Sequence, residues 1–182
     1  DFHRLKLQGN VVISSPEITL SGERFHLAEL TLLSTRDKAV FALRDLSGTA
    51  GAGLTYDIKK RYVVMKKPRG VLRRDGGTFE FQADELRLAE AKKLVLLNGD
   101  ATVTQDGAGL NARRIALQFS PGFERLEWAG GTGGCHWRST QPGAGGRRQC
   151  RDVSGERIRL ENDPLGRLQR VEIIGDGAVA LD

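Results

Sequence analysis

Apolar and polar residues alternate along most of this chain. Near its start, Leu5, Leu7, Val11 and Ile13 fall on one face of an extended backbone, and polar residues such as Lys6 fall on the other. The same alternation returns at Phe79 and Phe81, Leu86 and Leu88, Ile115 and Leu117, Leu126 and Trp128, Ile158 and Leu160, and Val171 and Ile173. A period of two residues indicates β-strands that bury one face. The chain is therefore predicted to be all-β, with negligible helix.

A repeat underlies this pattern. An interval of eighteen residues separates a glycine from a leucine three times, from Gly9 to Leu27, from Gly70 to Leu88 and from Gly99 to Leu117. The copies align without a gap, and residues 154–160 nearly repeat residues 21–27. Repeats of this kind indicate one supersecondary unit used several times. Each copy holds turn signals at two phases, so we expect about ten to twelve antiparallel strands in a meander.

The composition fits one continuous β domain over residues 1–182. Hydrophobic residues make up 39% of the chain, which is enough for a core and argues against disorder. Aromatic residues are only 6% while glycine reaches 23 residues, a balance typical of many turns between thinly packed strands. Because the repeat runs through most of the chain, we predict a single domain.

The net charge is +5, which by itself suggests an acidic partner such as nucleic acid, anionic lipid or a phosphorylated glycan. No recognition helix, zinc-finger spacing or aromatic RNA-binding strand accompanies the charge, so we predict no nucleic-acid partner. No apolar run is long enough to span a bilayer, and no signal peptide is visible. The first residues already read as strand without an initiator Met, so we expect that a targeting or anchoring segment was removed from a longer product.

The residue types that carry catalysis do not form catalytic patterns. The three histidines lack a second histidine or a carboxylate at ligand spacing, and no serine has matching His and Asp partners. Glycine clusters at 51–53, 130–134 and 143–146 lack the Gly-Lys-Ser/Thr of a phosphate loop. We therefore predict that the protein is not an enzyme and needs no cofactor or metal.

The last copy of the repeat is expanded. It needs thirty residues from Gly130 to Leu160, and the extra residues fall around Cys135 and Cys150, which predicts a hairpin insertion at about residues 135–150. Cys135, His136 and Cys150 offer at most three zinc ligands, and a fourth is missing. The two cysteines form either a disulfide between adjacent strands or a pair of free thiols, depending on the redox compartment.

The repeated element consists of a small residue, alternating leucines, a turn, an apolar strand and then Gly-Asn or Gly-Asp. It resembles the OstA-like repeat of the lipopolysaccharide transport proteins of the periplasm. The best matches are residues 9–13, 83–88 and 97–103, and residues 53–57 look like the strand of that family that ends in Tyr-Asp. The resemblance covers nearly the whole chain, although the insertion between the cysteines departs from the pattern of the family.

The resemblance implies an open, twisted antiparallel β-jellyroll, a folded sheet whose apolar inner face holds the acyl chains of lipopolysaccharide. It implies passage of that lipid across the periplasm toward the outer membrane. The implied partners are an inner-membrane transporter complex and other β-jellyroll proteins, or a second copy, joined through edge strands. It also implies a periplasmic location, with a tether to the inner membrane through an N-terminal segment absent from this sequence. In that oxidising compartment Cys135 and Cys150 are expected to form a disulfide.

We expect the repeat-equivalent apolar residues and their in-phase neighbours to line one continuous interior and to bind lipid. These positions are Leu20, Phe25, Leu27, Phe81, Leu86, Leu88, Leu96, Val103, Leu110, Ile115, Leu117, Trp128, Ile158 and Leu160. Lys66, Lys67, Arg73 and Arg74 are expected near an opening, where they attract phosphates. The alternative is a structural β-repeat or adhesin-like surface protein whose interior is a dry core without lipid.

Overall fold

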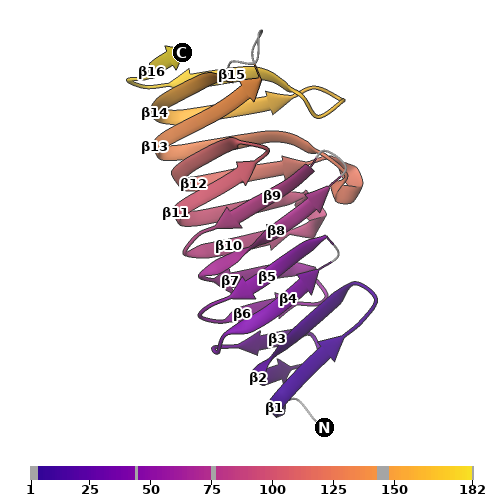
Figure 1. Cartoon of the computed structure of the whole chain (residues 1–182). Helices are drawn as coiled ribbons and strands as arrows, with labels where there is room; N and C mark the ends of the chain where they lie inside the picture. Colours follow the sequence, from indigo (N-terminus) through magenta and orange to yellow (C-terminus); the bar gives the residue numbers. More distant parts are fainter. Residues whose placement is uncertain (1–3, 44, 75–76, 143–147, 182) are drawn as a thin grey trace.

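The computed structural model describes residues 4–43, 45–74, 77–142 and 148–181, and these residues form one large twisted antiparallel sheet. The sheet does not close into a barrel within the described residues, and its strands stack from the N-terminal to the C-terminal end (Figure 1). The predicted all-β fold, an open twisted β-jellyroll built from a folded sheet, is confirmed. The described strands number sixteen, more than the sequence predicted.

The strands vary from four to seventeen residues in length. They are β1 (Arg4–Ser14), β2 (Ile18–Ala28), β3 (Leu32–Thr35), β4 (Ala39–Leu43), β5 (Leu46–Ala50), β6 (Leu54–Asp57), β7 (Tyr62–Lys66), β8 (Pro68–Arg74), β9 (Gly77–Gln82), β10 (Glu85–Ala89), β11 (Leu94–Gln105), β12 (Ala108–Phe119), β13 (Leu126–Pro142), β14 (Arg148–Asn162), β15 (Leu168–Ile174) and β16 (Ala178–Leu181). Two short 3-10 turns, η1 (Glu90–Lys92) and η2 (Pro121–Phe123), join strands.

The sheet is folded into two facing layers. The first half of β2 pairs with β4 and its second half with β3, while β11 pairs with β10 through its first half and with β9 through its second. Between β2 and β11 the sheet therefore divides into layer A, formed by β3, β6, β7 and β10, and layer B, formed by β4, β5, β8 and β9. Each of β1, β12, β13 and β14 likewise contributes one half to each layer; β15 continues layer A and β16 continues layer B.

The layers meet at a corner, where the long strands bend, and their free ends face each other at the opposite side, which we call the mouth. The bends coincide with register shifts, at Gly9 in β1, at Gly99 in β11 and at Gly133 and Gly134 in β13. These glycines have φ angles of +100°, +74°, +84° and +71°, a region that glycine enters without steric cost. Gly9 and Gly99, which open two copies of the sequence repeat, are thus residues at which a strand turns from one layer into the other, whereas Gly70 lies within β8 of layer B.

The hydrophobic core lies between the two layers. Its side chains come from the inward positions of both layers, and one cluster runs from β2 to β14. The largest side chains that are fully buried are Phe25, Phe41, Phe119, Leu20, Met65, Leu86, Leu97, Ile115 and Ile158. The apolar face predicted from the alternation therefore closes on itself across the fold.

Candidate functional site

The interior between the layers is the candidate site, and most of the apolar residues predicted for it lie there. The residues that are buried in the core are Leu20, Phe25, Phe81, Leu86, Val103, Leu110, Ile115, Leu117 and Ile158. Leu27, Leu88 and Leu160 are partly buried and pack against the same core. The structure therefore brings twelve of the fourteen predicted positions together in one interior.

Leu96 was predicted to face the interior, and this is wrong. It lies between the buried residues Val95 and Leu97 in β11, and it pairs with Arg87 and Ala116 across the outer face. Residues 94–97 are four consecutive apolar residues, so the sequence does not show which of them face inward. Alternation reveals the buried face of a strand only when the other face is polar. The inward residues Val95 and Leu97 were missed for the same reason.

Trp128 also lies on the outer face, against the prediction. The register of β12 with β13 shifts at Glu127, so that Phe119 pairs with Leu126 inside while Gln118 pairs with Trp128 outside. A bulge adds a residue to one strand and reverses the phase that simple alternation assigns. The guanidinium of Arg159 lies 4.8 Å from the centre of the Trp128 ring, a cation–π contact on the outer surface.

The predicted disulfide is absent, and both cysteines are free. Cys135 pairs with Gly155 and Cys150 with Thr140, in a register that places Pro142 opposite Arg148. Five residues along the strands separate the two cysteines, about 17 Å at the usual rise of a β-strand, whereas a disulfide needs Cα atoms within about 7 Å. The expansion of the repeat therefore lengthens two paired strands without joining them by a disulfide. The hairpin tip, 143–147, lies outside the described residues.

The surroundings of the two cysteines differ. Cys135 is buried, and burial raises the pKa of its thiol. Cys150 has its Sγ 3.4 Å from Nε of Arg138 on the outer face. His136 follows Cys135 on the opposite face, where its Nε2 lies 2.5 Å from a carboxylate oxygen of Asp152. The three candidate zinc ligands are thus not assembled, and the described residues contain no cluster of three groups suited to a metal.

The interior is not uniformly filled. A cavity of about 150 Å³, which we call cavity I, lies between the C-terminal strands. Its apolar lining includes Phe79, Val103, Leu110, Leu117, Leu126 and Trp137. A smaller cavity of about 50 Å³, cavity II, lies between the N-terminal strands and is lined by apolar side chains that include Tyr56, Val63, Leu72, Leu88, Val95 and Phe123. Both cavities border the mouth, since strand ends such as Gln105 and Ala108 line cavity I and the turn residues Arg61 and Glu90 line cavity II.

Phe123 closes part of the mouth. It is buried although it lies in the short turn η2, and its ring centre is 5.4 Å from that of Phe119. Nζ of Lys93 stands 5.2 Å from the centre of the Phe123 ring, on the side of the solvent. Phe123 lines cavity II, and Leu126, just beyond it, lines cavity I. The η2 turn therefore occupies the mouth where the two cavities approach each other.

An ion pair crosses the mouth above cavity II. Glu17 precedes the part of β2 that lies beside layer B, and Arg61 precedes β7 in layer A. The guanidinium of Arg61 lies 3.6 Å from the carboxylate of Glu17 and 3.3 Å from that of Glu90. Because the Arg61 and Glu17 side chains are 51% and 45% exposed, the pair joining the layers contributes little to stability.

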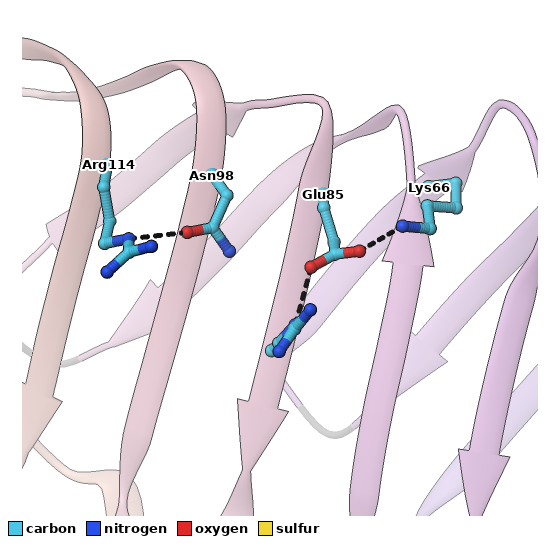
Figure 2. Close-up of polar contacts among 5 residues, drawn as sticks. Lys66, Glu85, Asn98 and Arg114 are labelled. Atoms are coloured by element: carbon cyan, nitrogen blue, oxygen red, sulfur yellow. Dashed lines mark hydrogen bonds and ion pairs between the residues drawn. The ribbon is translucent and has the colours of Figure 1, made fainter.

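The basic residues expected near an opening are only partly there. Lys66 ends β7 at the corner, opposite the mouth, and pairs on the outer face with Glu85, which Arg87 also contacts (Figure 2). The hydrogen bond from Lys66 holds the pKa of Glu85 below its usual value. Lys67 lies at the same corner, so the prediction is wrong for both lysines. Arg73 lies at the mouth end of β8, and the side chain of Arg74 lies outside the described part of the structure.

The outer face of layer A continues with polar pairs of this kind. Nε of Arg114 in β12 donates to the side-chain oxygen of Asn98 in β11 at 2.9 Å (Figure 2). Such pairs keep the outer face polar along the stack, so the apolar surface of the sheet is concentrated between the layers.

No family model matches this sequence, and no curated protein does. The described part of the chain holds no helix with the length and apolar content needed to span a membrane.

Proposed function

We propose that this protein binds the acyl chains of lipopolysaccharide between its two layers and passes the lipid across the periplasm toward the outer membrane. The observation that carries the proposal is a folded sheet whose facing surfaces are lined by aliphatic side chains, with an unfilled apolar cavity of about 150 Å³ at its mouth. The resemblance of the repeat to the OstA-like repeat gives independent support.

The physical reason for such a carrier is the cost of exposing lipid to water. Each exposed methylene costs about 0.8 kcal/mol, so one chain of about a dozen carbons costs near 10 kcal/mol to move bare through water. An apolar interior that runs along the stack of strands removes most of that cost. The polar sugar can remain in water outside the mouth.

Loading requires the layers to separate at the mouth. A cavity of about 150 Å³ is the size that holds one benzene-sized molecule, so a longer chain needs more room than cavity I offers. At the corner the layers are joined by continuous strands, whereas at the mouth the described contacts between them are made by side chains such as Glu17 and Arg61. Separation at the mouth therefore leaves the backbone pairing of each layer intact, and the acyl chain covers the core side chains that it exposes.

The two ends of the sheet suit the transfer of lipid between proteins. Among the described residues, β1 pairs only with β2, and β15 pairs only with β14, so each presents an unpaired edge. Edge strands add to other sheets through main-chain hydrogen bonds. We propose that another β-jellyroll protein of the transport chain, the inner-membrane transporter complex or a second copy pairs there. We also propose that the protein is periplasmic and is tethered to the inner membrane through an N-terminal segment.

The alternative proposal is a structural surface protein with a dry core. It is favoured by the small volume of cavity II, about 50 Å³, and by the dense packing of residues such as Leu20, Phe25 and Met65. A core of this density stabilises a β-stack without any ligand.

Site-specific photo-crosslinking separates the two proposals. A photoreactive amino acid replaces Leu117, which lines cavity I, or the neighbouring Ala116, which lies on the outer face beside Leu96. We expect lipopolysaccharide to crosslink at position 117 and not at position 116, because adjacent strand residues point to opposite faces. Equal labelling at both positions, or none at position 117 in a folded variant, would overturn acyl-chain binding and leave the dry core.

A further inference from the structure

Four turns of layer A form a continuous ridge along one side of the mouth. They are residues 29–31, 58–61, 90–93 and 120–125, which we call the mouth ridge. The amide of Ile58 donates to the carbonyl of Thr31 at 2.8 Å, and the amide of Glu90 to that of Arg61 at 3.2 Å. The amide of Phe119, at the start of the fourth turn, donates to the carbonyl of Lys93 at 2.9 Å. The ridge is therefore a connected surface beside cavity II.

The N-terminal end of the ridge exposes two large apolar side chains. Leu30 is 70% exposed and Ile58 is 43% exposed, and the hydrogen bond from Ile58 to Thr31 places their turns side by side. Both residues project from turns, where a polar residue is the usual choice. Their exposure gives the ridge an apolar tip.

The backbone conformation at Leu30 is one that leucine rarely adopts. Glu29 and Leu30 have φ angles of +51° and +54°, and the amide of Thr31 donates to the carbonyl of Ala28 at 3.0 Å. Positive φ at both central residues of a β-turn is the geometry that favours Asn-Gly, and a leucine is disfavoured in it. A leucine that is both exposed and conformationally unfavourable points to a contact outside the chain.

The charge of the ridge is positive. Its first three turns contain five basic residues, Lys59, Lys60, Arg61, Lys92 and Lys93, against the two acidic residues Glu29 and Glu90. Lys59 and Lys92 are exposed and make no ion pair within the described residues. The two exposed lysines therefore give the ridge a positive surface.

We propose that the mouth ridge docks on the surface of a membrane that contains anionic lipids. Leu30 and Ile58 enter the boundary between headgroups and acyl chains, and Lys59 and Lys92 pair with phosphates while their stems lie along the apolar region. Protruding apolar tips flanked by lysines suit a soft anionic surface better than a flat protein interface. In this orientation cavity II opens beside the lipid. The inference does not depend on which lipid the interior carries.

Sedimentation with lipid vesicles tests the docking. The full chain is mixed with vesicles of phosphatidylcholine containing phosphatidylglycerol, or with vesicles of phosphatidylcholine alone. We expect binding to the anionic vesicles that weakens as salt is added, because salt screens the lysines. Replacing Lys59 or Lys92 by Gln should weaken binding about fivefold for each lysine.

The decisive variant is the double substitution Glu29→Asn and Leu30→Gly. It gives the turn its preferred sequence, so the thermal stability of the protein should stay the same or rise. Removal of Leu30 should nevertheless weaken vesicle binding about tenfold relative to the single variant Glu29→Asn, which has the same charge. Loss of binding therefore cannot be attributed to unfolding.

The matched controls are Val12→Ser, an exposed apolar residue on the outer face of β1, and Lys38→Gln, an exposed lysine at the corner. Both should bind anionic vesicles as the wild type does. Equal binding by the double variant and the single variant Glu29→Asn, equal loss in the controls, or no preference of the wild type for anionic vesicles would overturn the proposal. None of these results depends on crosslinking inside the fold, so this docking and the proposed transport function can fail separately.

Discussion

Replacing Gly99 by alanine tests whether the glycine of the repeat sets the bend between the layers. Gly99 has a φ of +74°, and a Cβ there would stand 2.2 Å from Oδ2 and 2.7 Å from Cβ of Asp84. The amide of Asp84 is bonded to the carbonyls of Asn98 and Gly99, so the two segments cannot move apart freely. The substitution therefore combines backbone strain with a steric clash at the corner.

Both contributions can be assigned a size. Left-handed backbone costs an alanine about 1–2 kcal/mol, and overpacking adds about 1–3 kcal/mol. The expected loss is about 2–5 kcal/mol, which for a domain of this size lowers Tm by about 4 to 20 °C.

Gly134→Ala is the matched control, because Gly134 has a φ of +71° but a Cβ added there would meet no atom within 4 Å. It should suffer only the backbone strain, a fall in Tm of about 2 to 8 °C. Thermal unfolding followed by circular dichroism measures both variants. If Gly99→Ala melts with the wild type, or if the two variants fall equally, the corner does not depend on the contact between Gly99 and Asp84.

Three further predictions follow from the placement of single side chains. Leu117→Asp should abolish crosslinking to lipopolysaccharide at an interior probe while Ala116→Asp leaves it unchanged, because only the first puts a charge into the apolar interior; equal crosslinking in both folded variants would contradict this. The pKa of Glu85 lies below its ordinary value of 4.5, so its ionised form stabilises the folded state above that pH and this contribution disappears as pH falls through the folded-state pKa. Denaturant unfolding should accordingly show Glu85→Gln to be less stable than wild type at neutral pH and nearly equal at about pH 2, and a constant difference would refute the assignment. Thiol titration of unreduced, denatured protein should find two reactive thiols, from Cys135 and Cys150, whereas a result of none would restore the disulfide.

The number of strands could not be predicted from the sequence. The alternation predicts extended backbone correctly, but the short strands β3 to β10 each end at the corner or at the mouth. A bend at the corner leaves the period of two unchanged, so the sequence does not show that one extended segment contributes to two layers. The corner becomes visible only when β2 is seen to pair with both β3 and β4.

The two cysteines illustrate a second limit. Their positions on adjacent strands of one hairpin were predictable from the repeat. Whether they face each other depends on the residue about which the hairpin turns, and the pairing of Pro142 with Arg148 decides it. A shift of this centre by a few residues would change every cross-strand partner, and no local pattern fixes it.

The sequence by itself determined the β class, the repeat and most of the buried residues, because these follow from the period of two. The tertiary structure alone decided which face of the sheet Leu96 and Trp128 occupy. Leu96 lies in an uninterrupted apolar run and Trp128 follows a bulge, and in both cases the alternation along the chain does not show the buried face. The tertiary structure also decided what meets at the mouth. Glu17 and Arg61, or Leu30 and Ile58, are far apart along the chain and share no motif, and only the folding of the sheet into two layers places them together.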